Sequence, residues 1–278
     1  MDVQSASVAS IVGNIDHTLM QWDVSYRVQP KGIERIVHMR DEIMARIRKF
    51  RMETGKLPKH IIVYRDGVSE SEFQRALYNE KTDINVACKD IYGDNPHPTL
   101  TYIVVTKRHR TRFFPTTVDE DASELVSKSD RETRKQSCIS TSSDNACRYN
   151  VAPGTLVETE ITSPDYFDFY LVSQASPLGT AHPTHYYVLH DDWNPSPSFW
   201  QTVSYALCCS YMRCPKTISV PTPIMLAHLA AKRGKEYLEA INNRNRELVL
   251  TSKNRCEGWN HLLEHMTHPE DHIGMHFV

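Results

Sequence analysis

The sequence predicts an α/β domain, built as a mixed sheet with helices on its faces. Two apolar segments with strand-like patterning come first, and further short apolar runs follow that have the composition of buried strands. Longer segments with helical spacing lie between these runs, as in a sheet whose strands are connected through helices. The chain has 278 residues, of which 40% are hydrophobic, so it can bury one large core or two small ones.

The first two predicted strands are neighbours in the sequence. Apolar, mostly β-branched residues predict a strand over residues 7–15, and residues 22–29 alternate between apolar and polar side chains. We interpret the two segments as consecutive antiparallel strands.

A helix, a strand and a second helix are predicted next. Apolar residues recur with helical spacing over residues 33–51, opposite a charged face. The apolar run at residues 60–64 is interpreted as a buried strand that ends on Asp66. A Ser-x-x-Glu capping box that begins at Ser69 predicts a helix over about residues 70–80.

The middle of the chain changes character twice. Residues 101–106 form another apolar run, and residues 107–112 follow it with four cations, one histidine and no acid. From residue 116 to residue 150 the composition is polar, with almost no apolar periodicity. Because a compact domain rarely contains so long a plain loop, we expect a disordered insertion at 116–150.

The last part of the chain returns to regular patterns. Strands are predicted over residues 167–172 and 185–189, and a helix is predicted over residues 198–211. Thr222 followed by Pro223 predicts the start of the last large helix, with the threonine as capping residue and the proline at the first helical position. The histidines near the C-terminus have only partly helical spacing, and we interpret them as solvated.

Composition and charge exclude several classes of protein. The chain has 32 lysines and arginines and 34 aspartates and glutamates, which gives a net charge of -2. Because the whole chain is not positive, a binding site for a polyanion must depend on a local group of cations. No run approaches the roughly 18 apolar residues of a membrane helix, and the N-terminal residues lack the pattern of a secretory signal. The seven cysteines have neither zinc nor C-x-x-C spacing, which favours reduced thiols and a cytoplasmic or nuclear location.

Two features favour a ligand site from the residues alone. Asp66 closes an apolar strand, so its carboxylate should emerge at the C-terminal edge of the sheet, where open α/β sheets bind ligands. The alternative is an Asp-Gly turn residue that caps the next helix. The cations of residues 107–112 cannot all find acidic partners locally, which favours a phosphate-binding edge, although a solvated loop is the other interpretation.

Glu34, His228 and Arg233 have simpler explanations at this point. An acid in the first turn of a helix is favoured by the helix dipole alone. A histidine between Ala227 and Leu229 is more often a hydrogen-bonded core residue than a ligand. Arg233 follows His228 by five residues, about 140° around the helix, so one helix can direct the two side chains to different subsites.

Seven segments combine these features in one order along the chain: Tyr64–Glu70, Thr101–Val105, Lys107–Arg112, Phe167–Leu171, His185–Leu189, Tyr211–Cys214 and Ser219–Ala230. In order and in spacing they closely resemble the Piwi domain of eukaryotic Argonaute proteins. The resemblance extends from about Ser7 to Tyr237 and is interrupted at 116–150.

This resemblance implies an RNase H-like fold, with small guide RNA and target RNA as partners in RNA silencing. Cleaving members of the family are endonucleases that use a carboxylate-rich tetrad and divalent ions, Mg²⁺ or Mn²⁺. By the resemblance, Asp66 and His228 are catalytic metal ligands, and Glu34 is the family's glutamate finger. The guide-strand contacts are assigned in the same way to Lys107, Arg108, Arg112, His185, Tyr211, Arg213, Ser219 and Arg233.

The sequence departs from the family at its start. The family's first tetrad aspartate lies on the first strand of the fold, within Gly-Ala-Asp-Val-Thr-His-Pro, and this chain reproduces only an Asp-Val pair at Asp2 and Val3. We therefore expect residues 1–278 to be a partial Piwi domain that lacks most or all of that strand and has an incomplete endonuclease site. The alternatives are an RNA-binding module that does not cleave and a non-functional fragment. Other silencing proteins are candidate partners, and no membrane is expected.

Overall fold

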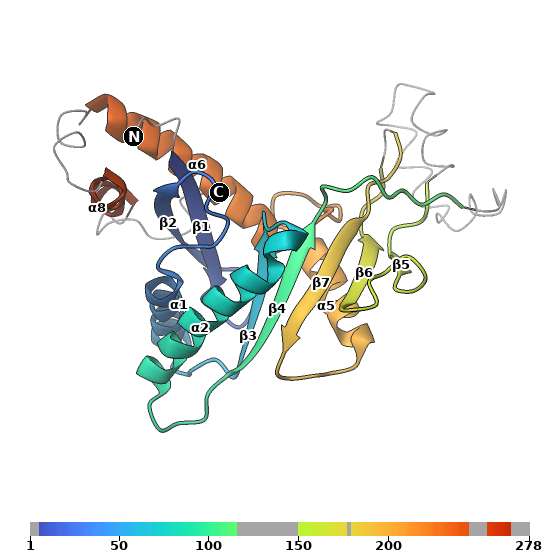
Figure 1. Cartoon of the computed structure of the whole chain (residues 1–278), viewed down its shortest axis with the longest axis horizontal. Coiled ribbons are helices and arrows are strands. Elements are labelled where there is room, and N and C mark those ends of the chain that lie inside the picture. The colour runs from blue at the N-terminus through green and yellow to red at the C-terminus, as the bar shows by residue number, and fades with distance from the viewer. Residues whose placement is uncertain (1–5, 116–149, 177–178, 245–254, 268–278) are drawn as a thin grey trace.

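The computed structural model of the chain describes residues 6–115, 150–176, 179–244 and 255–267. Within these residues, two sheets are packed between helices (Figure 1). Asp2 lies outside the described residues, and so does the insertion predicted at 116–150, except for Asn150.

Two sheets form the centre of the fold. β1 (Ala6–Asn14) and β2 (Trp22–Pro30) make an antiparallel hairpin, as the sequence predicts. The second sheet has the order β3-β4-β7-β6-β5, in which β3 and β4 are parallel and the other neighbours antiparallel. Among the described strands, β1 pairs only with β2, and β3 pairs only with β4. The strands of this sheet are β3 (His60–Asp66), β4 (Thr99–Thr106), β5 (Thr155–Val157), β6 (Phe167–Val172) and β7 (Thr184–Asp191).

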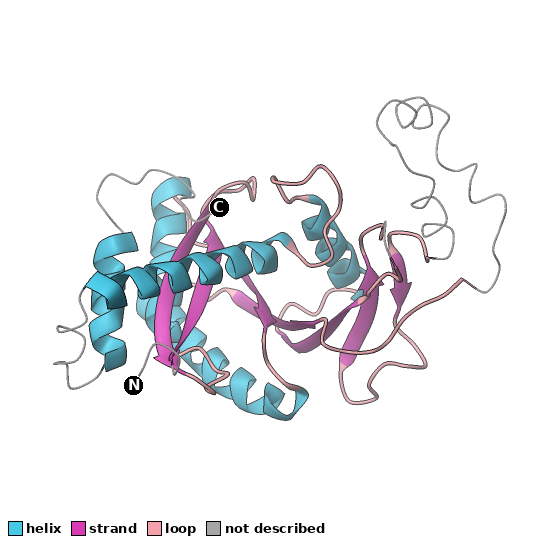
Figure 2. Ribbon diagram, turned by 90° about the horizontal axis from the view of Figure 1, so that it is seen from above, coloured by secondary structure: helices cyan, strands magenta, loops and turns pink. Residues whose placement is uncertain are grey.

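Helices cover the sheets from both sides, as seen from above in Figure 2. They are α1 (Met39–Thr54), α2 (Phe73–Tyr92), α5 (Pro197–Cys209), α6 (Thr222–Arg244) and α8 (Arg255–Thr267), with a short 3-10 helix, η2 (Glu70–Glu72), before α2. α1 and α2 pack together against Ile11 of β1 and Leu100 of β4. α6 and α8 pack on the hairpin where Val24 and Tyr26 are buried.

The alternation of side chains along β4 explains how the five-stranded sheet is enclosed. Tyr102 and Val104 pack in the cluster that contains α2, and Ile103 and Val105 pack in the cluster that contains α5. Neighbouring residues of a strand point to opposite faces, so a strand with helices on both faces must be apolar throughout. This is the physical origin of the apolar run that predicted a strand over residues 101–106.

The helix predicted over residues 33–51 is α1, and it begins only at Met39. Side chains hold the preceding backbone in an irregular conformation. Gln29 donates from Nε2 to two carbonyls of the connection between β2 and α1, and Glu80 accepts a backbone N–H there. Glu34 therefore lies in this connection, and the prediction that it occupies a first helical turn is wrong.

The helix predicted over residues 70–80 is longer and starts differently. It opens with η2, and α2 then continues to Tyr92. Ser69 makes no side-chain capping bond, and its hydroxyl donates to the carboxylate of Glu34. The capping-box interpretation is therefore wrong in its chemistry, although it marks the start of the helical segment.

The last helices are tied to their neighbours by side chains. The hydroxyl of Thr222 donates to the carbonyl of Leu207, 2.6 Å away, which joins the start of α6 to the end of α5. In α8, for which the sequence predicted no element, the amide of Asn260 accepts the N–H of Val28 at 2.6 Å and donates to its carbonyl at 3.1 Å. An amide side chain thus occupies the outer edge of β2 and protects it as a neighbouring strand would.

Candidate nucleic-acid interface and metal-ligand pair

Asp66 and His228 meet at the edge of the five-stranded sheet. Asp66 is the last residue of β3, and Gly67 turns the chain there with a φ of 78°, a conformation that glycine adopts without steric cost. His228 lies in the second turn of α6, and its Nε2 is 2.6 Å from Oδ2 of Asp66. Because the two side chains are 41% and 51% exposed, a ligand can reach both.

The surroundings of Asp66 favour its charged form. Partial burial opposes ionisation, but the hydrogen bond and charge of His228, the N–H of Gly67 and the nearby charge of Arg108 outweigh it. Together they hold the pKa of Asp66 below its ordinary value. The carboxylate is therefore ionised at neutral pH and can bind a cation.

In the variant His228→Ala, we expect the pKa of Asp66 to rise. The burial that opposes ionisation remains in this variant, whereas the hydrogen bond and charge of His228 are lost. In the native chain, a lowered pKa stabilises the fold above an unfolded pKa of about 3.9, and this stability is lost as the pH falls through the folded pKa. The pKa is measured by titrating the carboxyl carbon of Asp66 by NMR. His97→Ala, which removes an exposed histidine elsewhere, is the control, and an unchanged pKa in His228→Ala would contradict the contact.

Glu34 is held near this pair by the turn that follows Asp66. Its Oε2 accepts both the backbone N–H and the hydroxyl of Ser69, each at 3.0 Å. Ser69 comes three residues after Asp66, so one short turn carries contacts of both carboxylates. The role of Glu34 as a glutamate finger stays a prediction.

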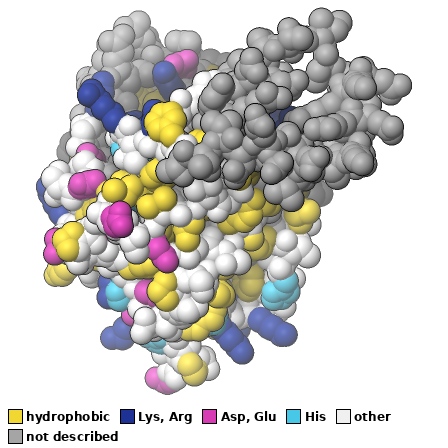
Figure 3. All heavy atoms as spheres, turned by 90° about the vertical axis from the view of Figure 1, so that its right-hand side faces the viewer, with side chains coloured by type: hydrophobic (Ala, Val, Ile, Leu, Met, Phe, Trp, Pro, Cys, Tyr) yellow, Lys and Arg dark blue, Asp and Glu magenta, His cyan; other side chains and the backbone are white. Residues whose placement is uncertain are grey.

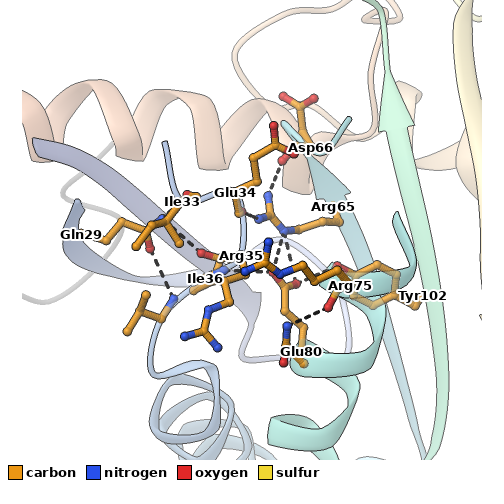
Figure 4. A network of polar contacts seen from close by, with 12 residues as sticks. Gln29, Ile33, Glu34, Arg35, Ile36, Arg65, Asp66, Arg75, Glu80 and Tyr102 are labelled. Carbon is orange, nitrogen blue, oxygen red and sulfur yellow. Dashed lines mark hydrogen bonds and ion pairs between the residues drawn. The ribbon is translucent and has the colours of Figure 1, made fainter. Parts of the chain in front are cut away.

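A buried network supports the backbone at this site (Figure 4). Glu80 of α2 is fully buried, and its carboxylate accepts the hydroxyl of Tyr102 at 2.7 Å and Nε of Arg65 at 3.2 Å. Arg65 also donates to the carbonyls of Asp66 and Glu34. One guanidinium therefore fixes the main chain at both predicted catalytic carboxylates.

Arg65, Glu80 and Ser69 were not singled out from the sequence as site residues. The sequence pattern could have indicated that Glu80 is buried, because it lies on the same face of α2 as the buried residues Ala76 and Ile84. A carboxylate on an apolar stripe needs a buried partner to offset its desolvation, which points to a cation or hydroxyl in the core. No comparable pattern pointed to Ser69.

The residues at this edge fit part of a metal site. Mg²⁺ takes about six ligands in octahedral geometry and prefers oxygen, and Mn²⁺ also accepts imidazole. Asp66 offers a carboxylate and His228 an imidazole nitrogen, whereas the carboxylate of Glu34 is engaged by Ser69. Within the described ranges, no group of three or more His, Cys, Asp or Glu side chains could hold a metal ion. The described residues therefore supply two donors and do not close a site.

The basic cluster of residues 107–112 begins next to Asp66. Arg108 is exposed, and its charge contributes to the lowered pKa of Asp66. Lys107 is partly buried, and this burial, with the nearby charge of Arg112, lowers the pKa of Lys107. Arg112 turns back to donate to the carbonyl of Thr111 at 2.7 Å. Only part of the cluster therefore faces solvent. Arg108 is the member of the cluster that acts on Asp66.

The positive charge of residues 107–112 is confined to their own part of the surface. On the face of the molecule at the β5 end of the sheet, acidic, basic and apolar side chains are interspersed (Figure 3). That mixture agrees with the net charge of -2. Attraction of a polyanion thus depends on the position of individual cations.

The other predicted phosphate contacts lie on neighbouring segments. His185 is buried on β7, with Nε2 2.5 Å from Oδ2 of Asp168, so its ring is engaged inside the protein. Tyr211 and Arg213 lie in the turn after α5, the first half-buried and the second exposed. Ser219 precedes α6 and uses its carbonyl to accept the hydroxyl of Thr184. Their contacts with RNA stay predictions.

Arg233 stands apart from these residues. It is exposed on α6, with its guanidinium carbon 5.5 Å from the centre of the Tyr237 ring and Nη1 3.6 Å from the carboxylate of Glu236. The hydrogen bond to Tyr237, followed by the charge of that residue, raises the pKa of Arg233. Arg233 comes five positions after His228 in the helix, which is about 7.5 Å along the axis. The structure therefore places the two side chains at different points of α6.

Comparisons with known proteins identify the class of this fold. The mixed sheet between helices matches the RNase H-like architecture of solved Argonaute structures. The family model described as the Piwi domain matches residues 2–239. The chain therefore belongs to the Piwi domain family.

One relative and two solved structures show how far the similarity extends. Piwi-like protein ergo-1 of Caenorhabditis elegans is 43% identical over 241 residues, which cover 86% of this chain and 19% of that protein. The C-terminal lobe of a budding yeast Argonaute has a TM-score of 0.73 at 25% identity, over 92% of this chain and 52% of that one. Kluyveromyces polysporus Argonaute with a guide RNA has a TM-score of 0.73 at 25% identity, over 90% of this chain and 30% of that one.

The chain spans about a fifth of the length of the curated relatives it matches. Among its described residues, none of the helices combines the length and the hydropathy needed to cross a bilayer.

Proposed function

We propose that this chain binds RNA along the edge of the sheet that carries Asp66 and Arg108, as the part of an Argonaute-type protein that holds a guide RNA and its paired target. The observation that carries this proposal is the contact between Asp66 and His228 beside an exposed arginine, within a domain of the Piwi family. A related Argonaute structure contains a guide RNA, which supports the choice of ligand.

The chemistry of the edge suits a nucleic-acid backbone. Arginine and lysine neutralise phosphates and release their counterions, which gives affinity that does not depend on sequence. A protein that reads a target by pairing it with a guide needs a grip on backbone shape and can leave base recognition to the guide. Arg108 and Arg213, both exposed, are the residues expected to contribute most to this grip.

We further propose that the described site does not cleave RNA by itself. Asp66 and His228 would hold one divalent ion, which when bound would stabilise negative charge at the scissile phosphate. Arg65 and Glu80 fix the main chain at Asp66 and Glu34, and Ser69 orients the carboxylate of Glu34. Because the described residues bring together only two donors, a further carboxylate is needed before the ion is held firmly.

Binding is tested with the full chain and a single-stranded RNA of about 20 nucleotides that carries a 5′-phosphate. We expect log affinity to fall linearly with log salt, with a slope of about −0.7 for each phosphate contact. Arg108→Ala and Arg213→Ala should each weaken binding about 3- to 10-fold and make the slope shallower by about one contact. Fluorescence anisotropy at several salt concentrations measures both quantities.

Lys56→Ala is the matched control, because Lys56 is an exposed cation beyond the far end of α1 and should leave affinity unchanged. RNA affinity that is undetectable, or equal losses in all three variants, would overturn the proposed interface. The cleavage statement has its own test. Product formed from a guide-matched target with Mg²⁺, and lost in Asp66→Ala, would show that the site is complete.

A further inference from the structure

Three histidine rings cluster at the same end of the sheet as the basic residues, outside the Asp66–His228 pair. His109 follows β4, His182 precedes β7, and His185 lies on β7. The ring centre of His109 is 4.9 Å from that of His182 and 6.1 Å from that of His185. Two segments that are distant in sequence, one with His109 and the other with His182 and His185, thus bring their imidazoles together.

His109 lacks the hydrogen bonds that a buried imidazole normally makes. Both of its ring nitrogens are buried, and within the described residues neither makes a well-formed hydrogen bond. The carbonyl of Pro183 is the backbone group near enough to act on the pKa of the ring. Its ring packs edge-on against Tyr170, with 5.4 Å between the ring centres. Buried polar atoms are nearly always paired in folded proteins, so a ring without well-formed hydrogen bonds is one whose bonding a further polar group would complete.

A buried carboxylate orients the third imidazole. Asp168 of β6 is fully buried, accepts the N–H of Ser163 at 2.8 Å, and lies 2.5 Å from Nε2 of His185. The ring of His185 is held between Tyr170 and Tyr187, at centre distances of 3.8 and 3.9 Å. Since Nε2 is engaged by Asp168, Nδ1 is the nitrogen left to meet another group.

Three charged groups among the described residues act on the cluster. Glu70 of η2 acts on His185 and accepts the hydroxyl of Tyr187 at 2.6 Å. Arg112 acts on His109. Asp168, Glu70 and Arg112 therefore set the charge around the rings.

The free protein holds the imidazoles of His109 and His185 in their neutral form at pH 7. Burial, followed by the neighbouring rings of His182 and His185, lowers the pKa of His109 to about 4. Burial also lowers the pKa of His185, against the opposing effect of Asp168. An anion placed among the rings would act in the other direction, because an adjacent negative charge favours the protonated form.

We propose that His109, His182 and His185 form a phosphate subsite that takes up a proton when RNA binds. This inference rests on the proposed RNA-binding function and extends it by assigning two residues, His109 and His182, and a pH dependence to the interface. Each imidazole that becomes protonated provides a charged donor to a phosphate oxygen, and the incoming phosphate offsets the cost of charging a buried ring. The same anion also meets Arg112 at the end of the basic cluster.

If the histidines take up a proton when RNA binds, the affinity for RNA rises as the pH falls. Uptake of one proton makes log affinity rise by at most one for each pH unit, whereas lysine and arginine contacts alone give almost no change between pH 7.5 and pH 5.5. We expect the Kd of the full chain for the 5′-phosphorylated RNA to fall about tenfold over this range, at constant ionic strength. His109→Gln should reduce this change to about threefold or less, because glutamine keeps a polar side chain that does not titrate there.

The test measures RNA affinity by anisotropy at pH 7.5, 6.5 and 5.5 for the native chain, His109→Gln and His182→Gln. His182 is only half-buried, so its variant keeps the test valid where His109→Gln fails to fold. His97→Gln, an exposed histidine outside the cluster, is the control and should keep the full pH dependence. NMR of the imidazole groups should in addition show His109 neutral in the free protein and protonated in the complex.

The outcomes separate the two proposals. A chain that binds no RNA at any of the three pH values overturns the proposed function and the subsite with it. A chain that binds RNA with the same Kd at all three values overturns the subsite alone. Equal pH dependence in the native chain, His109→Gln and His182→Gln also overturns it, because the linked proton then belongs to another group.

Discussion

The variant Glu80→Ala is expected to lose about 3–5 kcal/mol of unfolding free energy. Glu80 is fully buried and accepts hydrogen bonds from Tyr102, Arg65 and the N–H of Ile36. Its removal leaves the guanidinium of Arg65 without its buried carboxylate and the other two donors without their acceptor. Breaking a buried ion pair by deleting one partner is costly because the remaining charge is not compensated.

Urea unfolding of the native chain, Glu80→Ala and Glu53→Ala measures this loss. Glu53 is an exposed glutamate of α1, so its variant should stay within about 0.5 kcal/mol of the native value. A double-variant cycle with Arg65→Met should show that the two costs are not additive, since either substitution breaks the same pair. A Glu80→Ala variant as stable as Glu53→Ala would mean that the network in Figure 4 contributes little to the fold.

The second large effect is expected for Gly234→Ala in α6. Alanine in place of glycine within a helix ordinarily stabilises a protein by about 0.5–1 kcal/mol. Here the added Cβ would stand 2.6 Å from a ring carbon of Tyr26 and 2.9 Å from a methyl of Val8, because α6 crosses the hairpin closely at this point. Tyr26 is buried and has little room to move, so we expect a loss of about 1–3 kcal/mol.

Gly234→Ala tests how α6 packs on the hairpin, because a close crossing lowers the unfolding free energy whereas a looser one would raise it. Thermal and urea unfolding measure it, with Lys232→Ala, an exposed position of the same helix, as the control. A stabilised Gly234→Ala variant would contradict the close crossing. Since α6 also carries His228, an altered crossing would displace the imidazole from Asp66.

Much of the fold could be predicted from periodicity, because burial imposes it on the sequence. The alternation over residues 22–29 corresponds to β2, whose apolar side chains pack on α6 and α8 and whose polar side chains contact α1. The apolar run over residues 101–106 corresponds to β4, which has helices on both faces. Helix starts were predicted less well. Gln29 and Glu80 hold the backbone before α1, and Glu80 lies 44 residues from Ile36, so no local pattern encodes that contact.

The candidate site was predictable to a different degree at each residue. Asp66 could be placed from its position at a strand end, whereas His228 had a simpler local explanation and gained its role only from the family resemblance. The 2.6 Å contact between them depends on how α6 crosses the sheet, which is a property of the whole fold. The pairing of His185 with Asp168 and the unpaired nitrogens of His109 also arise from tertiary packing, so residue spacing alone did not indicate them.

The location of bound RNA tests the central claim most directly. RNA that contains 4-thiouridine is crosslinked to the full chain by near-ultraviolet light, and mass spectrometry then identifies the modified peptides. Binding along the sheet edge predicts crosslinks within residues 107–113 and 211–219, and their loss when salt displaces the RNA. Crosslinks confined to the exposed surface of α1, with none in those two segments, would contradict the proposed interface.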